Sequence, residues 1–218
     1  MKSRLIASLF LGLSLVASPA LAKDAPPATP AKTYPTVVDP DPTHDPQDVL
    51  NLDLSNGGRV VVRLMPAWAP NHVERIKTLV ARRFYDGLVF HRVIEGFMAQ
   101  TGDPKGTGEG GSDLPDLKAE FNPLPHVRGA VSMARTNDPD SANSQFFIVF
   151  YPRFALDRKY TVFGRVIAGM DVADRIERGE PPANPTRIVR ASMGNESVSP
   201  PAALPAPVAA PAPVPAPN

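Results

Sequence analysis

The strongest fold signal in the chain is the segment F-H-R-V-I-E-G-F-M-A-Q-T-G-D at residues 90–103. The residues from 88 to 94 have the composition of a strand, on which alternate residues share one face: Leu88, Phe90, Arg92 and Ile94. An arginine among large apolar residues is unusual, because arginine is rarely buried without a partner. Arg92 is therefore either a structural residue, ion-paired or packed at a rim, or a functional one.

A second segment, S-Q-F-F-I-V-F at residues 144–150, predicts a core strand. Gln145 is its exception, because a buried amide needs hydrogen-bond partners. Earlier in the chain, the run from Ser55 to Gly58 is a hairpin-turn signal between two apolar runs. Strands are predicted at residues 49–54, 59–64, 88–94, 97–100, 130–134, 146–150, 161–166 and 187–191.

Two helices are predicted between these strands. Pro70 can begin the first, in which apolar residues recur at helical spacing: Val73, Ile76, Leu79 and Val80. The second runs over residues 170–178 and is closed by Gly179. Many short strands with few helices predict a mainly β fold, a closed antiparallel barrel capped by helices.

Four motifs follow one another in the chain: F-H-R-V-I-x-G-F-M-x-Q-x-G-D, G-A-V-S-M-A-R, S-Q-F-F-I and L-D-x-x-Y-T-V-F-G-R-V. Together they resemble the cyclophilin family of peptidyl-prolyl cis-trans isomerases, and they look most like its shorter, secreted bacterial members. The resemblance covers residues 49 to about 192 and rests on several specific motifs rather than one. It implies a closed eight-stranded antiparallel β-barrel with a helix at each end and a substrate groove on its outer surface.

The resemblance also implies roles for individual residues. Arg92 matches the catalytic arginine of the family, and no cofactor or metal is implied. The implied substrate-binding residues are Phe97, Met98, Gln100, Ala134, Arg135, Gln145, Phe147, Leu156 and Tyr160. Among these, four match the pocket for the substrate proline ring: Phe97, Met98, Phe147 and Leu156. The two glutamines match amides that hold the substrate backbone, and residues 134–136 match the strand edge along which the preceding substrate residues lie.

The chain departs from the pattern at three positions. Many eukaryotic cyclophilins have tryptophan where this chain has Ala155, and histidine where it has Tyr160. These two changes put cyclosporin binding in doubt rather than catalysis. Arg135 stands where asparagine is common, and the contacts there are largely through backbone, so we expect the change to be tolerated.

Two other functions remain open from the sequence. One is a module or chaperone that binds proline-containing segments with little turnover. The other is a Rossmann-type oxidoreductase, because residues 106–111 fit G-x-G-x-x-G. No amphipathic helix follows that motif, so a tightly turning loop fits it better than a dinucleotide site, which needs a helix N-terminus. The four histidines show no metal-ligand spacing, and there is no G-x-S-x-G.

The first 22 residues predict a signal peptide. Lys2 and Arg4 precede an apolar run at residues 5–16, and Ala20-Leu21-Ala22 fits a cleavage site. We therefore expect export to a bacterial periplasm, with secretion as the alternative, and no membrane span after cleavage. The chain has no cysteine, which excludes disulfides and thiol chemistry.

The charge balance limits the partners. Without Lys2 and Arg4, the 23 Lys and Arg fall to 21, against 22 Asp and Glu. A mature chain near −1 argues against nucleic-acid binding, which needs a basic excess. The expected partners are proline-containing polypeptides, and we expect a monomer.

Proline content predicts the domain boundaries. Of the 27 prolines, seven fall in residues 23–47 and eight in residues 200–218. We therefore expect a Pro-rich N-terminal segment at 23–47, an isomerase domain at 48–192, and a Pro/Ala-rich disordered tail at 193–218. The tail is expected to be a spacer. Because it contains four Ala-Pro dipeptides, it could alternatively occupy the chain's own substrate groove.

Overall fold

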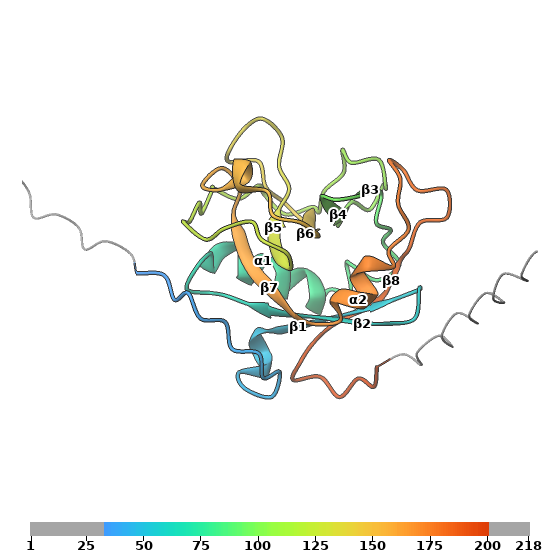
Figure 1. Ribbon diagram of the computed structural model, residues 1–218, viewed down its shortest axis with the longest axis horizontal. Helices are drawn as coiled ribbons and strands as arrows, with labels where there is room; N and C mark the ends of the chain where they lie inside the picture. The colour runs from blue at the N-terminus through green and yellow to red at the C-terminus, as the bar shows by residue number, and fades with distance from the viewer. Residues whose placement is uncertain (1–32, 201–218) are drawn as a thin grey trace, which may run out of the picture. The chain divides into compact units, whose positions relative to one another are not determined.

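Residues 33–200 are described by the computed structural model and contain eight strands and two α-helices (Figure 1). The strands are β1 Val49–Leu54, β2 Gly58–Leu64, β3 Arg92–Ile94, β4 Met98–Thr101, β5 Ala130–Met133, β6 Phe146–Val149, β7 Val162–Ala168 and β8 Ile188–Met193. The helices are α1 Pro70–Ala81 and α2 Met170–Asp174, with short 3-10 turns η1 Pro46–Asp48 and η2 Phe154–Leu156. The predicted signal peptide and most of the C-terminal tail lie outside the described residues.

The strands form one antiparallel sheet in the order β3-β4-β6-β5-β7-β2-β1-β8, curled into a half-barrel. The predicted closed barrel is wrong, because the outermost strands β3 and β8 are not paired with each other. Residues 88–90 instead form one isolated antiparallel bridge with the chain at the start of β8, Val89↔Arg187: Phe90 N donates to Thr186 O at 2.9 Å, and Ile188 N donates to Leu88 O at 2.8 Å. Three prolines at 181, 182 and 185 precede β8, and proline has no N–H with which to extend a ladder.

The hairpin and the first helix are confirmed. β1 and β2 pair up to Leu54↔Gly58 around the turn, where Gly57 has φ 77°. α1 starts at Pro70, buries the predicted apolar side and contacts β8. α2 contacts β2 but is shorter than predicted, ending at Asp174. Neither helix of residues 33–200 is long and apolar enough to cross a membrane.

The predicted strand at 88–94 is shortened to β3, and this changes which residues share a face. Phe90 is fully buried in the interior core together with Val93. Arg92 and Ile94 instead lie on the outer side, Ile94 within a second apolar cluster that contains Met98 and Phe147. The alternation fails between Phe90 and Arg92 because residues 88–90 bond to residues 186–188 rather than continuing the β3–β4 ladder.

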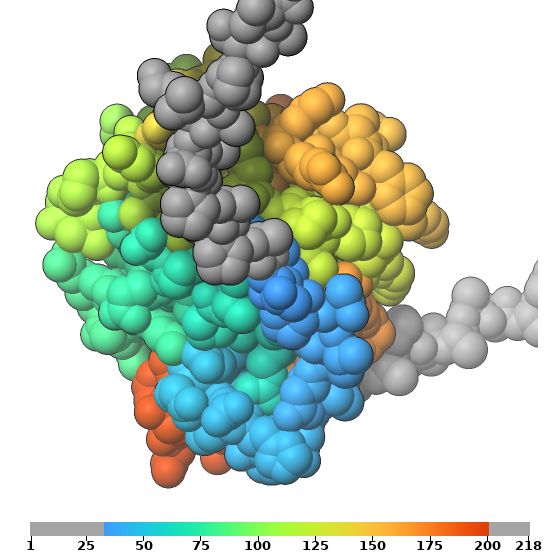
Figure 2. Space-filling model, turned by 90° about the vertical axis from the view of Figure 1, so that its left-hand side faces the viewer, coloured from blue at the N-terminus to red at the C-terminus, as the bar shows by residue number. Residues whose placement is uncertain are grey.

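The described part of the Pro-rich N-terminal segment lies on the surface of the folded domain (Figure 2, blue). Arg63, only 4 % exposed, donates to four backbone carbonyls in this segment. The acceptors, at 2.5–3.3 Å, are the carbonyl oxygens of Asp39, Asp41, His44 and Asp45. Trp68 Nε1 donates to Pro35 O at 2.8 Å. These bonds attach residues 35–45 to β2 and to the turn before α1.

Candidate active site

Strand register brings the polar residues of the two signal segments to one face. Arg92 pairs with Gln100 across β3–β4, and Gln100 pairs with Phe147 across β4–β6. Directly paired residues of an antiparallel sheet point to the same side. All three side chains therefore project outward, while the residues between them, such as Ala99 and Ile148, are buried in the interior core.

Nine of the ten predicted site residues line one pocket of about 280 Å³, here called the Arg92 pocket. Its lining residues are Arg92, Phe97, Met98, Gln100, Ala134, Arg135, Phe147, Leu156 and Tyr160. Its apolar side is aromatic: the rings of Phe97 and Phe147 have centroids 6.5 Å apart, and Tyr160 stands edge-on to Phe147. The Arg135 guanidinium lies over the Tyr160 ring, 4.4 Å from its centroid. The pocket thus combines apolar rings with cationic side chains.

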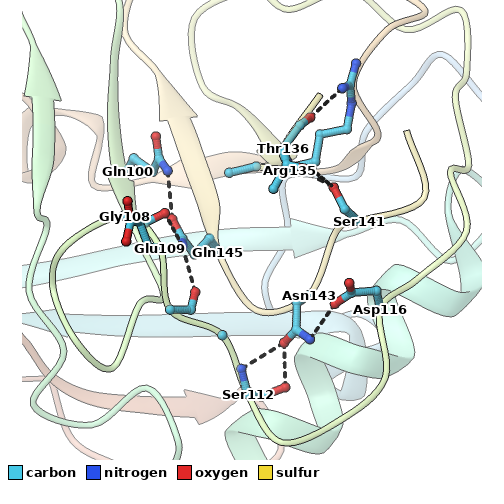
Figure 3. Close-up of a pocket in the computed structure, with 13 residues that line it drawn as sticks. Gln100, Gly108, Glu109, Ser112, Asp116, Arg135, Thr136, Ser141, Asn143 and Gln145 are labelled. Atoms are coloured by element: carbon cyan, nitrogen blue, oxygen red, sulfur yellow. Dashed lines mark hydrogen bonds between the residues drawn. The ribbon is translucent and has the colours of Figure 1, made fainter. Parts of the chain in front are cut away.

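The tenth residue, Gln145, lines an adjacent pocket of about 440 Å³, the Gly108 pocket (Figure 3). Gln145 Nε2 donates to the carbonyls of Gly108 and Gly110 at 2.9 and 2.7 Å. Its Oε1 accepts from Gln100 Nε2 at 2.8 Å, and Gln100 Oε1 lies 3.5 Å from Arg92 Nη1. The side-chain amides of Gln145 and Gln100 therefore connect the glycine loop, residues 106–111, to Arg92. These hydrogen bonds fix the direction in which each amide points.

The glycine loop is held by Asp103, which sequence reasoning did not select. This carboxylate is 1 % exposed and accepts from the backbone N–H groups of Lys105, Thr107 and Gly108 at 2.6–2.8 Å. Burial opposes its ionisation, but these donors outweigh burial and lower the pKa of Asp103. No helix follows the loop before β5, and the sheet is antiparallel, so the Rossmann alternative is wrong.

His126 packs against Phe147 of the Arg92 pocket, and no motif or spacing in the sequence singled it out. Its Nδ1 lies 2.9 Å from Asp157 Oδ1 and its Nε2 lies 3.1 Å from Ser132 Oγ. Its ring stacks on Phe147, with centroids 6.1 Å apart and an interplanar angle of 18°. Burial lowers the pKa of His126, against the opposing effect of Asp157. The imidazole, held by Asp157 and Ser132, therefore packs beside the Phe147 ring of the Arg92 pocket.

Comparison with known proteins decides the family. Residues 49–193 match the family model described as cyclophilin type peptidyl-prolyl cis-trans isomerase/CLD. The chain belongs to the cyclophilin family. This cyclophilin is 46 % identical over 165 residues to a probable peptidyl-prolyl cis-trans isomerase of Brucella suis biovar 1, covering 68 % of this chain and 84 % of the relative. It is also 46 % identical over 125 residues to peptidyl-prolyl cis-trans isomerase-like 3 of Gallus gallus, covering 56 % and 77 %.

Solved cyclophilin structures share the fold. AquaCyp293 from Hirschia baltica superposes with a TM-score of 0.63 at 34 % identity, over 68 % of this chain and 74 % of that one. A Cryptosporidium parvum cyclophilin, crystallised in the presence of the dipeptide ala-pro, has a TM-score of 0.62 at 27 % identity, over 66 % and 98 %. The chain is therefore a cyclophilin-type peptidyl-prolyl cis-trans isomerase.

We expect this cyclophilin to lose stability on mild acidification. Burial lowers the pKa values of His72, His91 and His126 in the folded state, whereas a hydrogen bond to Asp39 raises the pKa of His44, so three of the four histidines act in the same direction. The unfolded chain, with histidine pKa values near 6.5, therefore binds more protons as the pH falls below about 6.5. The free energy of unfolding should be flat near pH 7.5–8 and should fall towards pH 5.5. Urea unfolding at several pH values measures this, and a constant stability from pH 7.5 to 5.5 would contradict it.

Proposed function

We propose that this cyclophilin accelerates rotation about X-Pro bonds in exported proteins, with Arg92 as the catalytic residue, and so assists their folding as a monomer. The observation that carries the proposal is the position of Arg92, whose guanidinium lies at the edge of an apolar pocket beside a fixed amide. The predicted signal peptide supports the exported location.

The reaction needs no covalent chemistry. Amide resonance gives the X-Pro bond a barrier of about 18–20 kcal/mol, and uncatalysed isomerisation takes tens to hundreds of seconds. As the bond twists, the proline nitrogen regains its lone pair and can accept a hydrogen bond. A guanidinium is permanently charged and presents several donors in a fixed plane, so Arg92 stabilises the twisted state more than either planar state.

The remaining residues restrict the motion to one bond. The proline ring enters the apolar side of the Arg92 pocket, between Phe97, Met98, Phe147 and Leu156. Gln100, held by Gln145, binds the carbonyl side of the substrate. The edge at Ala134 and Arg135 binds the preceding residues through backbone. With both sides held, rotation takes place about the X-Pro bond alone.

A peptide isomerisation assay on the mature chain, residues 23–218, tests the proposal directly. We expect catalysed cis-trans exchange of an X-Pro peptide. Binding of the peptide without acceleration would instead support the chaperone alternative. Fractionation of cells that express the full chain tests the exported location, which requires a processed protein outside the cytoplasm.

Cyclosporin should inhibit this cyclophilin about ten- to hundredfold less well than relatives with tryptophan at the position of Ala155. Ala155 is exposed in η2, beside Leu156 of the Arg92 pocket, and offers neither a ring nor a donor. A lost aromatic, hydrogen-bonding contact is worth about 1–3 kcal/mol. Ala155→Trp should restore the affinity while barely changing peptide turnover. Tight binding by the wild type would show that Ala155 does not set the affinity.

Truncation after Val198 should leave the kinetics unchanged if the C-terminal tail is a spacer, which is the result we expect. The truncated chain keeps the Val198 carbonyl, which accepts from Arg59 Nη1 at 3.1 Å. The alternative is self-binding of the tail, supported by its Ala-Pro dipeptides and by the ala-pro used with the Cryptosporidium relative. A tethered tail would compete at roughly millimolar effective concentration. A lower apparent KM at unchanged kcat in the truncated chain would establish that alternative.

A further inference from the structure

Arg92 has a second partner that the family motifs do not contain. Its Nε donates to Glu180 Oε2 at 2.8 Å, on the side of the guanidinium away from the longer Gln100 contact. Glu180 lies in the proline-rich segment before β8, 88 residues further along the chain. The two side chains are 41 % and 52 % exposed, so the pair lies at the open edge of the pocket.

Backbone bonding, rather than chance proximity, brings Glu180 to this place. Val93 N donates to Gly179 O at 2.8 Å, and Gly179 N donates to Val93 O at 2.9 Å. In this antiparallel bridge the residue before Val93 lies beside the residue after Gly179, which places Arg92 beside Glu180. Gly179 has φ 144°, and a Cβ there would lie within 2.6–2.9 Å of the next two prolines, so the turn requires glycine.

A second ion pair holds the same turn on its other side. Arg178 Nε donates to Glu95 Oε2 at 2.7 Å, and its guanidinium lies over the Phe150 ring, 4.5 Å from the centroid. Its Nη1 also donates to the carbonyls of Asp174 and Ile176. Because residues 178 and 179 are bound to β3 and its neighbours, Glu180 is presented from a fixed turn.

The two contacts of Arg92 leave one edge of its guanidinium available. Nε is bound to Glu180 and Nη1 is near Gln100, while Nη2 makes no hydrogen bond within residues 33–200. A free arginine side chain samples many rotamers, and it must lose part of that rotamer entropy before its donors can act in one orientation. We propose that Glu180 is a positioning residue that holds the Arg92 guanidinium with its Nη2 edge toward the substrate. This inference rests on the proposed catalytic role of Arg92.

Removing Glu180 is expected to have a moderate effect on turnover. The exposed Arg92–Glu180 pair contributes little energy and acts by orienting the guanidinium. Glu180→Ala should lower kcat for an X-Pro peptide by about three- to tenfold with little change in KM. Glu180→Gln keeps an acceptor oxygen and should recover part of the loss. Glu74→Ala, which removes an exposed glutamate of α1 away from the pocket, is the matched control and should turn over like the wild type.

Salt dependence separates positioning from a merely structural role. Added NaCl screens an exposed pair, so wild-type kcat should fall towards that of Glu180→Ala, whose own kcat should respond little. Thermal unfolding of the variant should be unchanged, and Glu180→Ala should cause no further loss in an Arg92→Ala background. If Arg92→Ala reduces turnover but Glu180→Ala does not, the positioning role is wrong and that of Arg92 stands. If Arg92→Ala turns over normally, the proposed function of Arg92 fails and this inference fails with it.

Discussion

Arg92→Ala is expected to turn over an X-Pro peptide about 10²–10³-fold more slowly than the wild type, the usual loss for one transition-state donor. The other guanidinium of the Arg92 pocket cannot take over, because Arg135 is bound to the carbonyls of Thr136 and Lys159. A saturation experiment should assign the loss mainly to kcat, since the apolar side of the pocket still binds the proline ring.

The fold of Arg92→Ala should remain intact, because the side chain lies outside both apolar clusters and is 41 % exposed. Arg92→Lys is the informative companion variant. It keeps the positive charge but lacks the planar arrangement of donors, so we expect it to remain poor. Near-normal activity of Arg92→Ala would remove the arginine from the mechanism, and full activity of Arg92→Lys would show that charge alone is sufficient.

Trp68→Ala is expected to lower the free energy of unfolding by about 3–5 kcal/mol, the usual cost of truncating a buried tryptophan. Trp68 is 1 % exposed and packs in the same cluster as Met98 and Phe147 of the Arg92 pocket. Its indole also donates to Pro35 O, so the variant loses an attachment of the N-terminal segment. Urea unfolding at pH 7.5 measures the change.

Trp68→Phe separates these two contributions. It keeps a ring in the cluster but removes the N–H donor, so we expect a loss of about 0.5–1.5 kcal/mol for the hydrogen bond, with some further cost for the smaller ring. A Trp68→Ala protein within 1 kcal/mol of the wild type would show that the cluster repacks, contrary to this prediction.

Local patterns and motifs predicted much of the fold and of the site. The hairpin turn needs residues that tolerate positive φ, and the periodicity of α1 reflects its buried side, so both could be read from neighbouring residues. The segments at residues 90–103 and 144–150 contain six of the ten predicted site residues, which come together because β3, β4 and β6 are adjacent in the sheet. Nine of the ten selected residues therefore meet at one pocket.

The features that were missed depend on contacts between distant parts of the chain. The path of residues 177–187, which precede β8, determines whether β3 and β8 can pair. No local sequence pattern shows which strand this segment approaches. Glu180 reaches Arg92 through the same segment. Asp103 and His126 act through buried hydrogen bonds, for which a single sequence contains no periodic signal. The proline content of residues 23–47 likewise carries no information on the backbone carbonyls through which Arg63 and Trp68 bind this segment.

The hydrogen bonds from Arg63 to residues 39–45 determine which substitutions this segment can accept. Its guanidinium contacts only carbonyl oxygens, which every amino acid possesses, including proline. These hydrogen bonds therefore do not depend on which side chains the segment carries. Prolines in the segment cost none of them, because proline lacks only the N–H donor and keeps its carbonyl. Substitutions at Pro40, Pro42 or Thr43 should be tolerated as long as the backbone path is kept. A graft of foreign residues at these positions would offer protein engineers an anchored attachment point outside the Arg92 pocket.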